Sequence, residues 1–321
     1  MSTGLAIPVF CASLAVTLAA TVVFARELDR LSERLGVSEG LHGILTALGA
    51  DAPEIATAVA ALLSSRSKIG VGVVIGSNVF NLAALLGLSA LVAGHVRIHR
   101  HGLVLNGAVG LAVTGLAVAL VLGTIGAVAA TVLLLAVFLP YVFVLARPPR
   151  SGFLAAAVRE EVEDIRTGEH APKASRVDGL ALAAALALIV AGSVGMVHAA
   201  EDLGRRWGVS DVIVGTLVLA AVTSLPNLLT AVRLAVRGRG AATVSEAFNS
   251  NSLNVLAGVA VPALFLALGS ASGLVTFSVW WLLGMTAVAV VFAYAGHGLR
   301  RAEGAVIVAL YVAFAAVIAS R

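Results

Sequence analysis

The chain has 321 residues, of which 60% are hydrophobic and only 12% are charged, and its mean hydropathy is +1.04. An average soluble domain contains about 25% charged residues, so this composition excludes a pair of ordinary soluble domains and indicates a chain embedded mostly in lipid. The net charge of +4 does not indicate nucleic-acid binding, because the basic residues lie between the apolar segments. Cys11 is the single cysteine, so no intrachain disulfide can form.

Ten segments are long and apolar enough to cross a bilayer, whose hydrocarbon core requires about 20 apolar residues per helix. The first five predicted spans lie at 5–25, 40–65 and 69–96 and within 102–146, which divides at 123–126. The next five lie at 179–200 and 212–232, within 247–299, which divides at 269–273, and at 304–320. The sequence therefore predicts an all-α polytopic membrane protein with ten transmembrane helices.

The basic residues predict the orientation of these spans. With the N-terminus outside, sixteen of the 21 Lys and Arg residues fall in cytoplasmic loops and five fall outside. Both termini are therefore expected outside and loop 147–177 in the cytoplasm, in a plasma membrane of prokaryotic type. Segment 5–25 has no basic region before it, which favours a retained helix over a cleaved signal peptide. Within the loop, 153–166 could be an interfacial amphipathic helix or part of a solvated linker.

The chain contains an internal repeat. Thr-Ala-Val at 57–59 recurs at 230–232, and Gly-Val-Ser at 36–38 recurs at 208–210. Four more matches occur at the same offset as the first: Pro53 with Pro226, Ser77 with Ser250, Asn78 with Asn251, and Asn81 with Asn254. Five predicted spans separate equivalent points, and an odd number inverts the second copy. We expect a first five-helix repeat at 1–146 (motif region 40–93) and a second at 178–321 (motif region 208–268).

Inverted repeats are common in secondary transporters, whose binding sites lie near the bilayer midplane where broken helices meet. Pro53 and Pro226 fall within spans, so each is expected to break its helix and free backbone carbonyls.

Asp51 and Glu54 are the only acidic residues well inside a predicted span. A charge at the bilayer centre costs ~2.5 kcal/mol or more, and residues three apart share a helix face, so both should point into the protein. Polar residues of other repeat spans accompany them: Asn78, Asn81, Thr223, Ser224, Asn227, Asn249, Ser250, Asn251 and Asn254. Their oxygens suit hard cations such as Ca²⁺ or Na⁺, although a single Asn or Ser can equally hold helices together. His42 is expected to be structural.

These motifs resemble the sodium/calcium exchanger branch of the calcium/cation antiporter superfamily. That family carries two inverted repeats, each with a segment similar to G-T-S-x-P-E followed on the next helix by G-S-N-x-x-N/D. The matching segments here are Gly-Ala-Asp-Ala-Pro-Glu at 49–54, Gly-Ser-Asn-Val-Phe-Asn at 76–81, Val-Thr-Ser-Leu-Pro-Asn at 222–227 and Asn-Ser-Asn-Ser-Leu-Asn at 249–254. With the ten predicted spans, the resemblance covers nearly the whole chain.

The resemblance implies a ten-helix bundle in which helices two, three, seven and eight surround cation sites, while helices one and six slide across them during alternating access. In the family, the carboxylate after each proline bridges the central sites, a position held here by Glu54 and Asn227. The further implied ligands are Ser77, Asn81, Thr223, Ser224, Ser250, Asn254 and the backbone carbonyls of Ala47 and Ala220. The implied function is Ca²⁺ export in exchange for Na⁺ by a monomer in the lipid bilayer, with inorganic cations as ligands and no cofactor.

The sequence departs from the family pattern at three places. Asn227 replaces the second-repeat carboxylate, Asn254 stands where Asp can occur, and Ala50-Asp51 replaces the first-repeat Thr-Ser. Two formal negative charges are left, enough to neutralise one Ca²⁺ or two monovalent ions. Because two carboxylates one turn apart in a desolvated site also make proton coupling credible, an H⁺- or K⁺-coupled antiporter is an alternative.

Two other classes of protein are considered. A cation channel would also gather carboxylates at mid-membrane, but inverted repeats favour alternating access over a pore. An intramembrane protease would need a second intramembrane Asp or an H-E-x-x-H motif, and neither is present.

Overall fold

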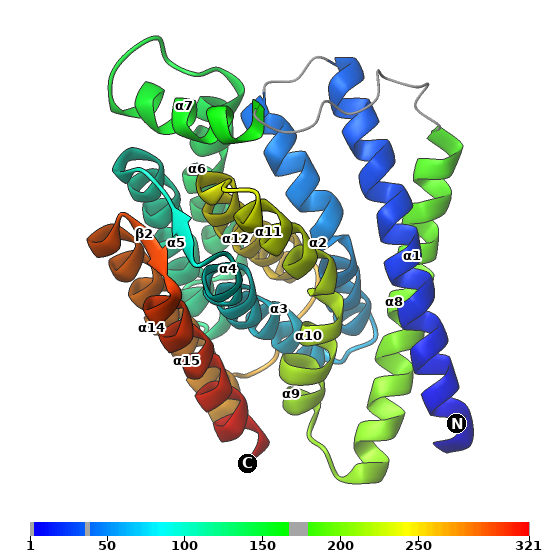
Figure 1. Cartoon of the computed structure of the whole chain (residues 1–321). Helices are drawn as coiled ribbons and strands as arrows, with labels where there is room; N and C mark the ends of the chain where they lie inside the picture. Colours follow the sequence, from blue (N-terminus) through cyan, green and yellow to red (C-terminus); the bar gives the residue numbers. More distant parts are fainter. Residues whose placement is uncertain (1–2, 36–38, 167–178, 321) are drawn as a thin grey trace.

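A computed structural model of the chain describes residues 3–35, 39–166 and 179–320 (Figure 1). The first half contains α1 (Thr3–Leu35), α2 (Glu39–Leu63), α3 (Ser67–Asn81), the π-helix η1 (Leu82–Leu88), α4 (Ser89–Ala93), β1 (His95–Arg97), α5 (Arg100–Val121), α6 (Ala127–Ala146) and α7 (Phe153–Arg166). The second half contains α8 (Gly179–Trp207), α9 (Asp211–Ile213), η2 (Val214–Leu219), α10 (Ala220–Thr223), α11 (Leu225–Val236), α12 (Gly240–Val255), η3 (Leu256–Ala260), α13 (Val261–Ala263), α14 (Gly273–Gly296), β2 (Gly298–Arg300) and α15 (Arg301–Ala319).

The chain is a mostly helical polytopic protein. Among the described residues, eight helices are long and apolar enough to cross a membrane, and a ninth span results if Asp211–Thr223 and Leu225–Val236, which meet at a 47° bend, count as one. The eighth predicted span corresponds to α12, η3 and α13, which are not among the eight. The Asn and Ser residues of α12 make this stretch more polar than the others, so its hydropathy alone does not identify it as a span.

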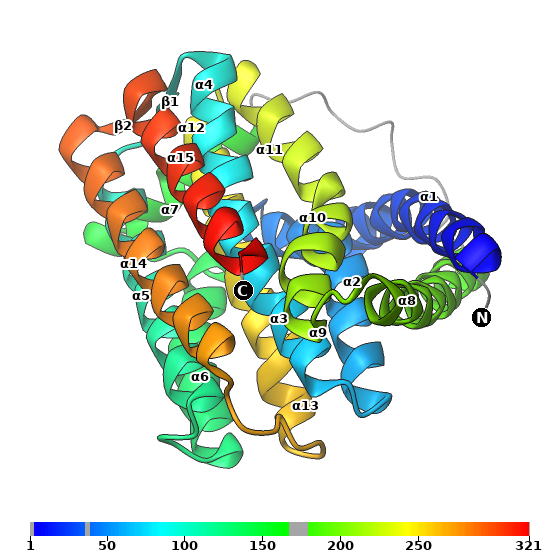
Figure 2. The same cartoon turned by 90° about the horizontal axis from the view of Figure 1, so that it is seen from below.

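The helices form a central bundle with one pair of long helices beside it. Viewed from below, α3 lies near the centre, whereas α1 and α8 run side by side at the edge (Figure 2). Every residue of α12 is buried, which makes it the most enclosed element around the site. In α1, by contrast, large apolar side chains such as Leu5 and Val22 are exposed, as expected for a surface that faces lipid.

The junctions between elements follow local sequence chemistry. Gly123 has a positive φ of 71° and turns the chain between α5 and α6, as its place in the predicted break suggests. The second break also lies where predicted, with Gly269 at φ 74° and the Ser272 hydroxyl capping the start of α14. A short antiparallel ladder between β1 and β2, with His95 opposite Arg300, joins the two halves and was not predicted.

Helix α7 shows that 153–166 is helical, as one of the two interpretations of the loop expected. It lies across one end of the bundle, and its buried Val158 packs with Ile44, Phe138 and Leu145 (Figure 1). Residues 167–177 of the predicted loop lie outside the described residues. Helix α1 begins and α15 ends at the opposite end of the bundle from α7 (Figure 1).

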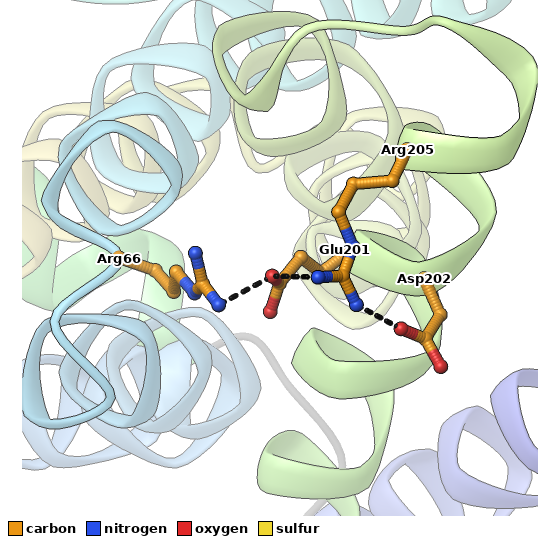
Figure 3. Close-up of polar contacts among 4 residues, drawn as sticks. All are labelled: Arg66, Glu201, Asp202 and Arg205. Atoms are coloured by element: carbon orange, nitrogen blue, oxygen red, sulfur yellow. Dashed lines mark hydrogen bonds and ion pairs between the residues drawn. The ribbon is translucent and has the colours of Figure 1, made fainter. Parts of the chain in front are cut away.

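At that opposite end, an ion-pair network ties α8 to the turn between α2 and α3 (Figure 3). The Arg66 guanidinium lies 2.6 Å from the buried Glu201 carboxylate, and Arg205 Nη1 lies 3.7 Å from the same oxygen. Arg205 also pairs with Asp202. The outer helix pair is therefore anchored to the bundle by a contact that crosses between elements.

Pro53 does not break its helix, contrary to our expectation. Helix α2 runs without interruption from Glu39 to Leu63 with Pro53 inside it. A proline removes a single N–H donor and holds φ near the helical value, so a helix packed on several sides can continue through it. The expected break occurs only in the second half, where Ser224, at φ −80° and ψ 0°, separates α10 from α11 and Pro226 stands in the first turn of α11.

Candidate cation-binding site

The two halves of the chain meet at a reciprocal pair of asparagines. Asn78 Nδ2 donates to the backbone oxygen of Asn251 at 3.0 Å, and Asn251 Nδ2 donates to the backbone oxygen of Asn78 at 3.1 Å. The two residues are 173 positions apart, the offset of the repeat. Two residues that exchange equivalent bonds lie across a local two-fold axis, so the repeat in the sequence corresponds to a symmetric contact in space.

Glycines allow the backbones around this contact to approach closely. A methyl group at Gly76 would lie 2.1 Å from the carbonyl oxygen of Thr216, and one at Gly215 would lie 2.5 Å from that of Ile69. Helix α3 and η2 are therefore in backbone contact, the kind of packing that small residues permit in membrane helices.

Both carboxylates of α2 point into this contact region and are fully buried. Ser224 Oγ donates to Glu54 Oε1 at 2.5 Å, and Asn227 Nδ2 lies 3.0 Å from Glu54 Oε2 and 2.6 Å from Asp51 Oδ1. Ser250 Oγ also donates to Asp51. Within the described part of the chain, neither carboxylate forms an ion pair with a basic side chain. Neutral donors only partly offset the cost of burying two negative charges, so the site favours a cation.

Several buried oxygens near these carboxylates have no hydrogen-bond donor among the described residues. They are Asp51 Oδ2, Ser77 Oγ, Asn81 Oδ1, Asn227 Oδ1, Asn251 Oδ1 and Asn254 Oδ1. An unsatisfied buried polar atom costs about 1–3 kcal/mol, so a ligand that contacts these oxygens would recover part of that cost. Carboxylate and amide oxygens are the ligands that Ca²⁺ takes, about six to eight at a time, and the donor set fits a hard cation.

The amide groups of the same asparagines hold them in place. Asn81 Nδ2 donates to Ser250 Oγ at 3.1 Å, and Asn254 Nδ2 donates to Asn78 Oδ1 at 3.3 Å. Asn81 and Asn254 thus each use the nitrogen within the protein and leave the oxygen available. Such an arrangement orients oxygens toward a shared ligand without further rearrangement.

Backbone irregularities surround this cluster. The π-helix η1 begins directly after Asn81, and η3 begins two residues after Asn254. Short π-helical turns within α-helices occur often at functional sites because they change the direction of backbone carbonyls. The sequence does not predict them, because no residue pattern distinguishes a π-turn from an α-turn in an apolar run.

The remaining predicted ligands are two backbone carbonyls and one hydroxyl, and they differ in what they contact. Ala47 and Ala220 are fully buried, as a role for their backbone carbonyls requires. The Thr223 hydroxyl, however, donates to the carbonyls of Leu219 at 2.9 Å and Ala220 at 3.3 Å. Thr223 therefore directs its proton to its own helix, and the Ala220 carbonyl is already partly engaged. The side chain of His42 lies outside the described residues.

Two buried features near the site were not predicted from the sequence. Thr57 is fully buried on the face of α2 that carries Glu54, one turn away, and its hydroxyl has no partner among the described residues; its i,i+3 spacing from Glu54 was an available signal. Tyr141 Oη lies 2.8 Å from Asn106 Oδ1 and 2.8 Å from Asn249 Oδ1. Asn249 is thereby turned toward α5 and α6.

A family model and several known proteins are similar to this chain over most of its length. The family model described as sodium/calcium exchanger protein matches residues 5–147 and 179–319. The sodium/calcium exchanger MaX1 of Methanosarcina acetivorans is 24% identical over 92% of this chain and 93% of its own length. The inner membrane protein YrbG of Escherichia coli is 28% identical over 76% of this chain and 74% of its own.

Among solved structures, the sodium-calcium exchanger NCX_Mj soaked with Na⁺ and Sr²⁺ superimposes with a TM-score of 0.65 at 21% identity, covering 98% of this chain and 99% of that one. At that identity the likeness establishes the fold. The family match extends over nearly all of both halves and includes every residue of the buried cluster. The chain belongs to the sodium/calcium exchanger family.

Proposed function

We propose that this protein exports Ca²⁺ in exchange for Na⁺ by alternating access. It is a cation antiporter rather than an enzyme, in keeping with its family and its relatives. The observation that carries the choice of ions is a set of two carboxylates that lack a basic partner among the described residues, together with six buried oxygens without a donor, one of which is Asp51 Oδ2. Two negative charges match one Ca²⁺ or two Na⁺, so the same site can hold either ion in turn.

The proposed ligand set follows the contacts described above. Glu54 and Asp51 supply the charge, and the oxygens of Ser77, Asn81, Asn227, Ser250, Asn251 and Asn254 complete the coordination, with Asn78 closing the contact between the halves. Ser224 holds Glu54, Thr223 contributes its hydroxyl oxygen, and the carbonyls of Ala47 and Ala220 line the approach. The bend before Pro226 gives α10 and α11 separate directions at the site.

We further propose the membrane arrangement. Residues 1–146 and 178–321 form two inverted five-helix repeats, giving ten spans with α12, η3 and α13 as the eighth. Loop 147–177 lies in the cytoplasm and both termini lie outside, in a prokaryotic plasma membrane. The protein works as a monomer, requires no cofactor and contacts only the bilayer and inorganic cations.

The outer pair α1 and α8 provides the moving part in this proposal. The two helices pack against each other through small residues, and a methyl group at Gly192 would lie 2.2 Å from the Thr17 hydroxyl. The pair lies beside the central bundle rather than within it (Figure 2). Because the two helices pack closely against each other at the edge of the bundle, they can slide as one body over the site when the ion pair between Arg66 and Glu201 opens.

Flux through sealed vesicles tests the proposal. The purified protein is reconstituted with Na⁺ inside, and uptake of Ca²⁺ from outside is measured with and without the gradient. We expect gradient-driven uptake that saturates with Ca²⁺ and falls by about tenfold or more in Glu54→Gln, since a unit charge beside a buried divalent ion is worth several kcal/mol. Glu303→Gln, which changes a carboxylate at the start of α15, is the matched control. Uptake that ignores the Na⁺ gradient and is unchanged in Glu54→Gln would exclude the proposal.

A second candidate is coupling to H⁺ or K⁺ in place of Na⁺. It is favoured by one observation, namely that both carboxylates lie one turn apart on the same helix and share Asn227 as a donor. Such a pair can hold a proton in place of a metal ion. Imposing H⁺, K⁺ and Na⁺ gradients one at a time identifies the driving ion, and ion conductance without saturable exchange would indicate a channel.

A further inference from the structure

The charge of the site is distributed unequally between the two halves of the chain. Both buried carboxylates stand on α2, whereas the second half contributes only amides and hydroxyls to the cluster. Asn227 occupies the position that matches Glu54 at the repeat offset. One half therefore supplies all of the formal charge to a site that both halves enclose.

Asp51 and Asn227 touch across the boundary between the halves. Asn227 Nδ2 donates to Asp51 Oδ1 at 2.6 Å, and Ser250 Oγ contacts both side chains, since it lies 3.1 Å from Asn227 Nδ2 and donates to Asp51. The other oxygen of each side chain, Asp51 Oδ2 and Asn227 Oδ1, has no donor among the described residues. Each side chain therefore binds its neighbour through one polar atom and leaves its other oxygen without a donor among the described residues.

Aspartate and asparagine have nearly the same size and shape, so exchanging them between these positions keeps the volume and the contact. After the exchange, an amide at position 51 would donate to a carboxylate at position 227, which reverses the present bond and retains both free oxygens. The exchange also removes the bond from Asn227 Nδ2 to Glu54 Oε2 at 3.0 Å and places the new carboxylate beside Glu54, so recovery is expected with a cation bound between them. The total charge of the site would stay at minus two. A single replacement, by contrast, changes the charge that a bound cation meets.

We propose that positions 51 and 227 form a pair that carries one carboxylate of the cation site on either member, and that Asp51 determines the preference for a divalent ion by supplying this charge. The inference rests on the proposed function, because it assumes that the cluster binds the transported cation. In this inference, the carboxylate belongs to the contact between the two positions and not to either residue alone.

The test measures Ca²⁺ binding to the purified protein by calorimetry, with Ca²⁺ as the only added ligand, in the wild type and three variants. Asp51→Asn should weaken binding by about tenfold or more, because a buried unit charge near the ion is lost. The double variant Asp51→Asn with Asn227→Asp should restore binding to within about threefold of the wild type, a difference below about 1 kcal/mol. The comparison variant Asp51→Asn with Asn81→Asp has the same total charge, but its new carboxylate lies on α3, where Asn81 donates to Ser250. It should restore binding less well.

Three results would overturn the inference: Asp51→Asn binding as tightly as the wild type, the exchanged variant binding no better than Asp51→Asn, or Asn81→Asp restoring binding equally well. The last would show that only the total charge matters. Thermal unfolding gives an independent readout, because Asn227→Asp alone places its new carboxylate in contact with Asp51 and Glu54 and should lower the unfolding temperature. Adding Asp51→Asn removes the first of these contacts and should reverse part of that loss. If this reversal is absent, the pair is not coupled.

Failure of the proposed function has a different signature. If Na⁺ does not drive Ca²⁺ uptake in the wild type, the function is wrong, yet binding and unfolding of the wild type and its variants still report on the pair. If the wild type exchanges the two ions but the exchanged variant does not recover, the function stands and the pairing is wrong.

Discussion

The two halves of the chain share a framework and differ in chemistry. At the repeat offset, Asn78 and Asn251 make equivalent bonds to each other. The two carboxylates of the cluster, however, both come from the first half, and the bend of 47° lies in the second. Symmetry is kept where the halves hold each other and is lost where side chains face the ligand, which is expected if packing and binding impose separate requirements.

The largest effect on this comparison is expected at Gly76, whose counterpart at the repeat offset is Asn249. Gly76→Ala would place a methyl group 2.1 Å from the Thr216 carbonyl oxygen and 2.6 Å from its Cα. Backbone cannot yield as a flexible side chain does, so we expect a loss of about 1–3 kcal/mol of stability or more and slower transport, because Ser77 moves with it. Thermal unfolding in detergent and vesicle flux measure the two effects.

Asn249→Ala is the matched change in the second half. It removes the bond from Asn249 Nδ2 to Ser245 Oγ at 3.0 Å and the contact with Tyr141, so we expect a loss of about 1 kcal/mol. If the two variants lower the unfolding temperature equally, the close backbone approach at Gly76 stabilises the fold no more than the side-chain bonds of Asn249 do.

The part of the site that could be predicted from the sequence is the part with a repeated pattern. Ser250, Asn251 and Asn254 repeat Ser77, Asn78 and Asn81, and Asp51 and Glu54 are charges three residues apart in an apolar span, so all of them are expected to face the interior. The contact of Tyr141 with Asn106 joins residues that have no repeated pattern, so only the packing of α5 on α6 reveals it.

Two other features, the continuous helix at Pro53 and the ion pair between Arg66 and Glu201, depend on packing between distant segments, which the sequence alone does not reveal. Pro53 predicted a break, but α2 continues through it, because the loss of one hydrogen bond does not end a helix that packs against several others. The ion pair between Arg66 and Glu201 lies at an expected span boundary, where the sixth span was predicted to end before Glu201. Its partners are far apart in the chain, and each on its own resembles a solvated loop residue.

Two ion pairs of the outer helices should differ in how much they stabilise the protein, by less than the glycine and asparagine variants do. Glu201 on α8 pairs with Arg66 of another element, whereas Glu27 on α1 pairs with Arg30 in the same helix (Figure 3 shows the first pair). Arg66→Gln leaves the buried Glu201 with Arg205 at 3.7 Å, so we expect a loss of about 1 kcal/mol, moderated by the 41% exposure of the arginine. Arg30→Gln should cost less, about 0.3–0.5 kcal/mol, because its pair with the equally buried Glu27 lies within one helix and joins no second element.

Thermal unfolding of both arginine variants at low and high salt tests the difference. Both pairs join a buried glutamate to an arginine that is partly exposed, 32% for Arg30 and 41% for Arg66, so salt should reduce the two effects to a similar extent. A loss from Arg30→Gln as large as that from Arg66→Gln would show that the pair between two elements stabilises the protein no more than the pair within one helix.

The smallest effect is a pH dependence in the ladder that joins the halves. Burial, together with Arg97 and Arg300, lowers the pKa of His95 below its ordinary value of 6.5, and Glu303 opposes this weakly. The folded protein therefore binds this proton less readily than the unfolded chain. The contribution of His95 to stability is complete above about pH 6.5 and decreases as the pH falls below that value. His95→Gln should flatten the decrease in unfolding temperature between about pH 7.5 and pH 5.5. An unchanged slope in that variant would show that the ladder between β1 and β2 does not sense pH and joins the halves by its backbone bonds alone.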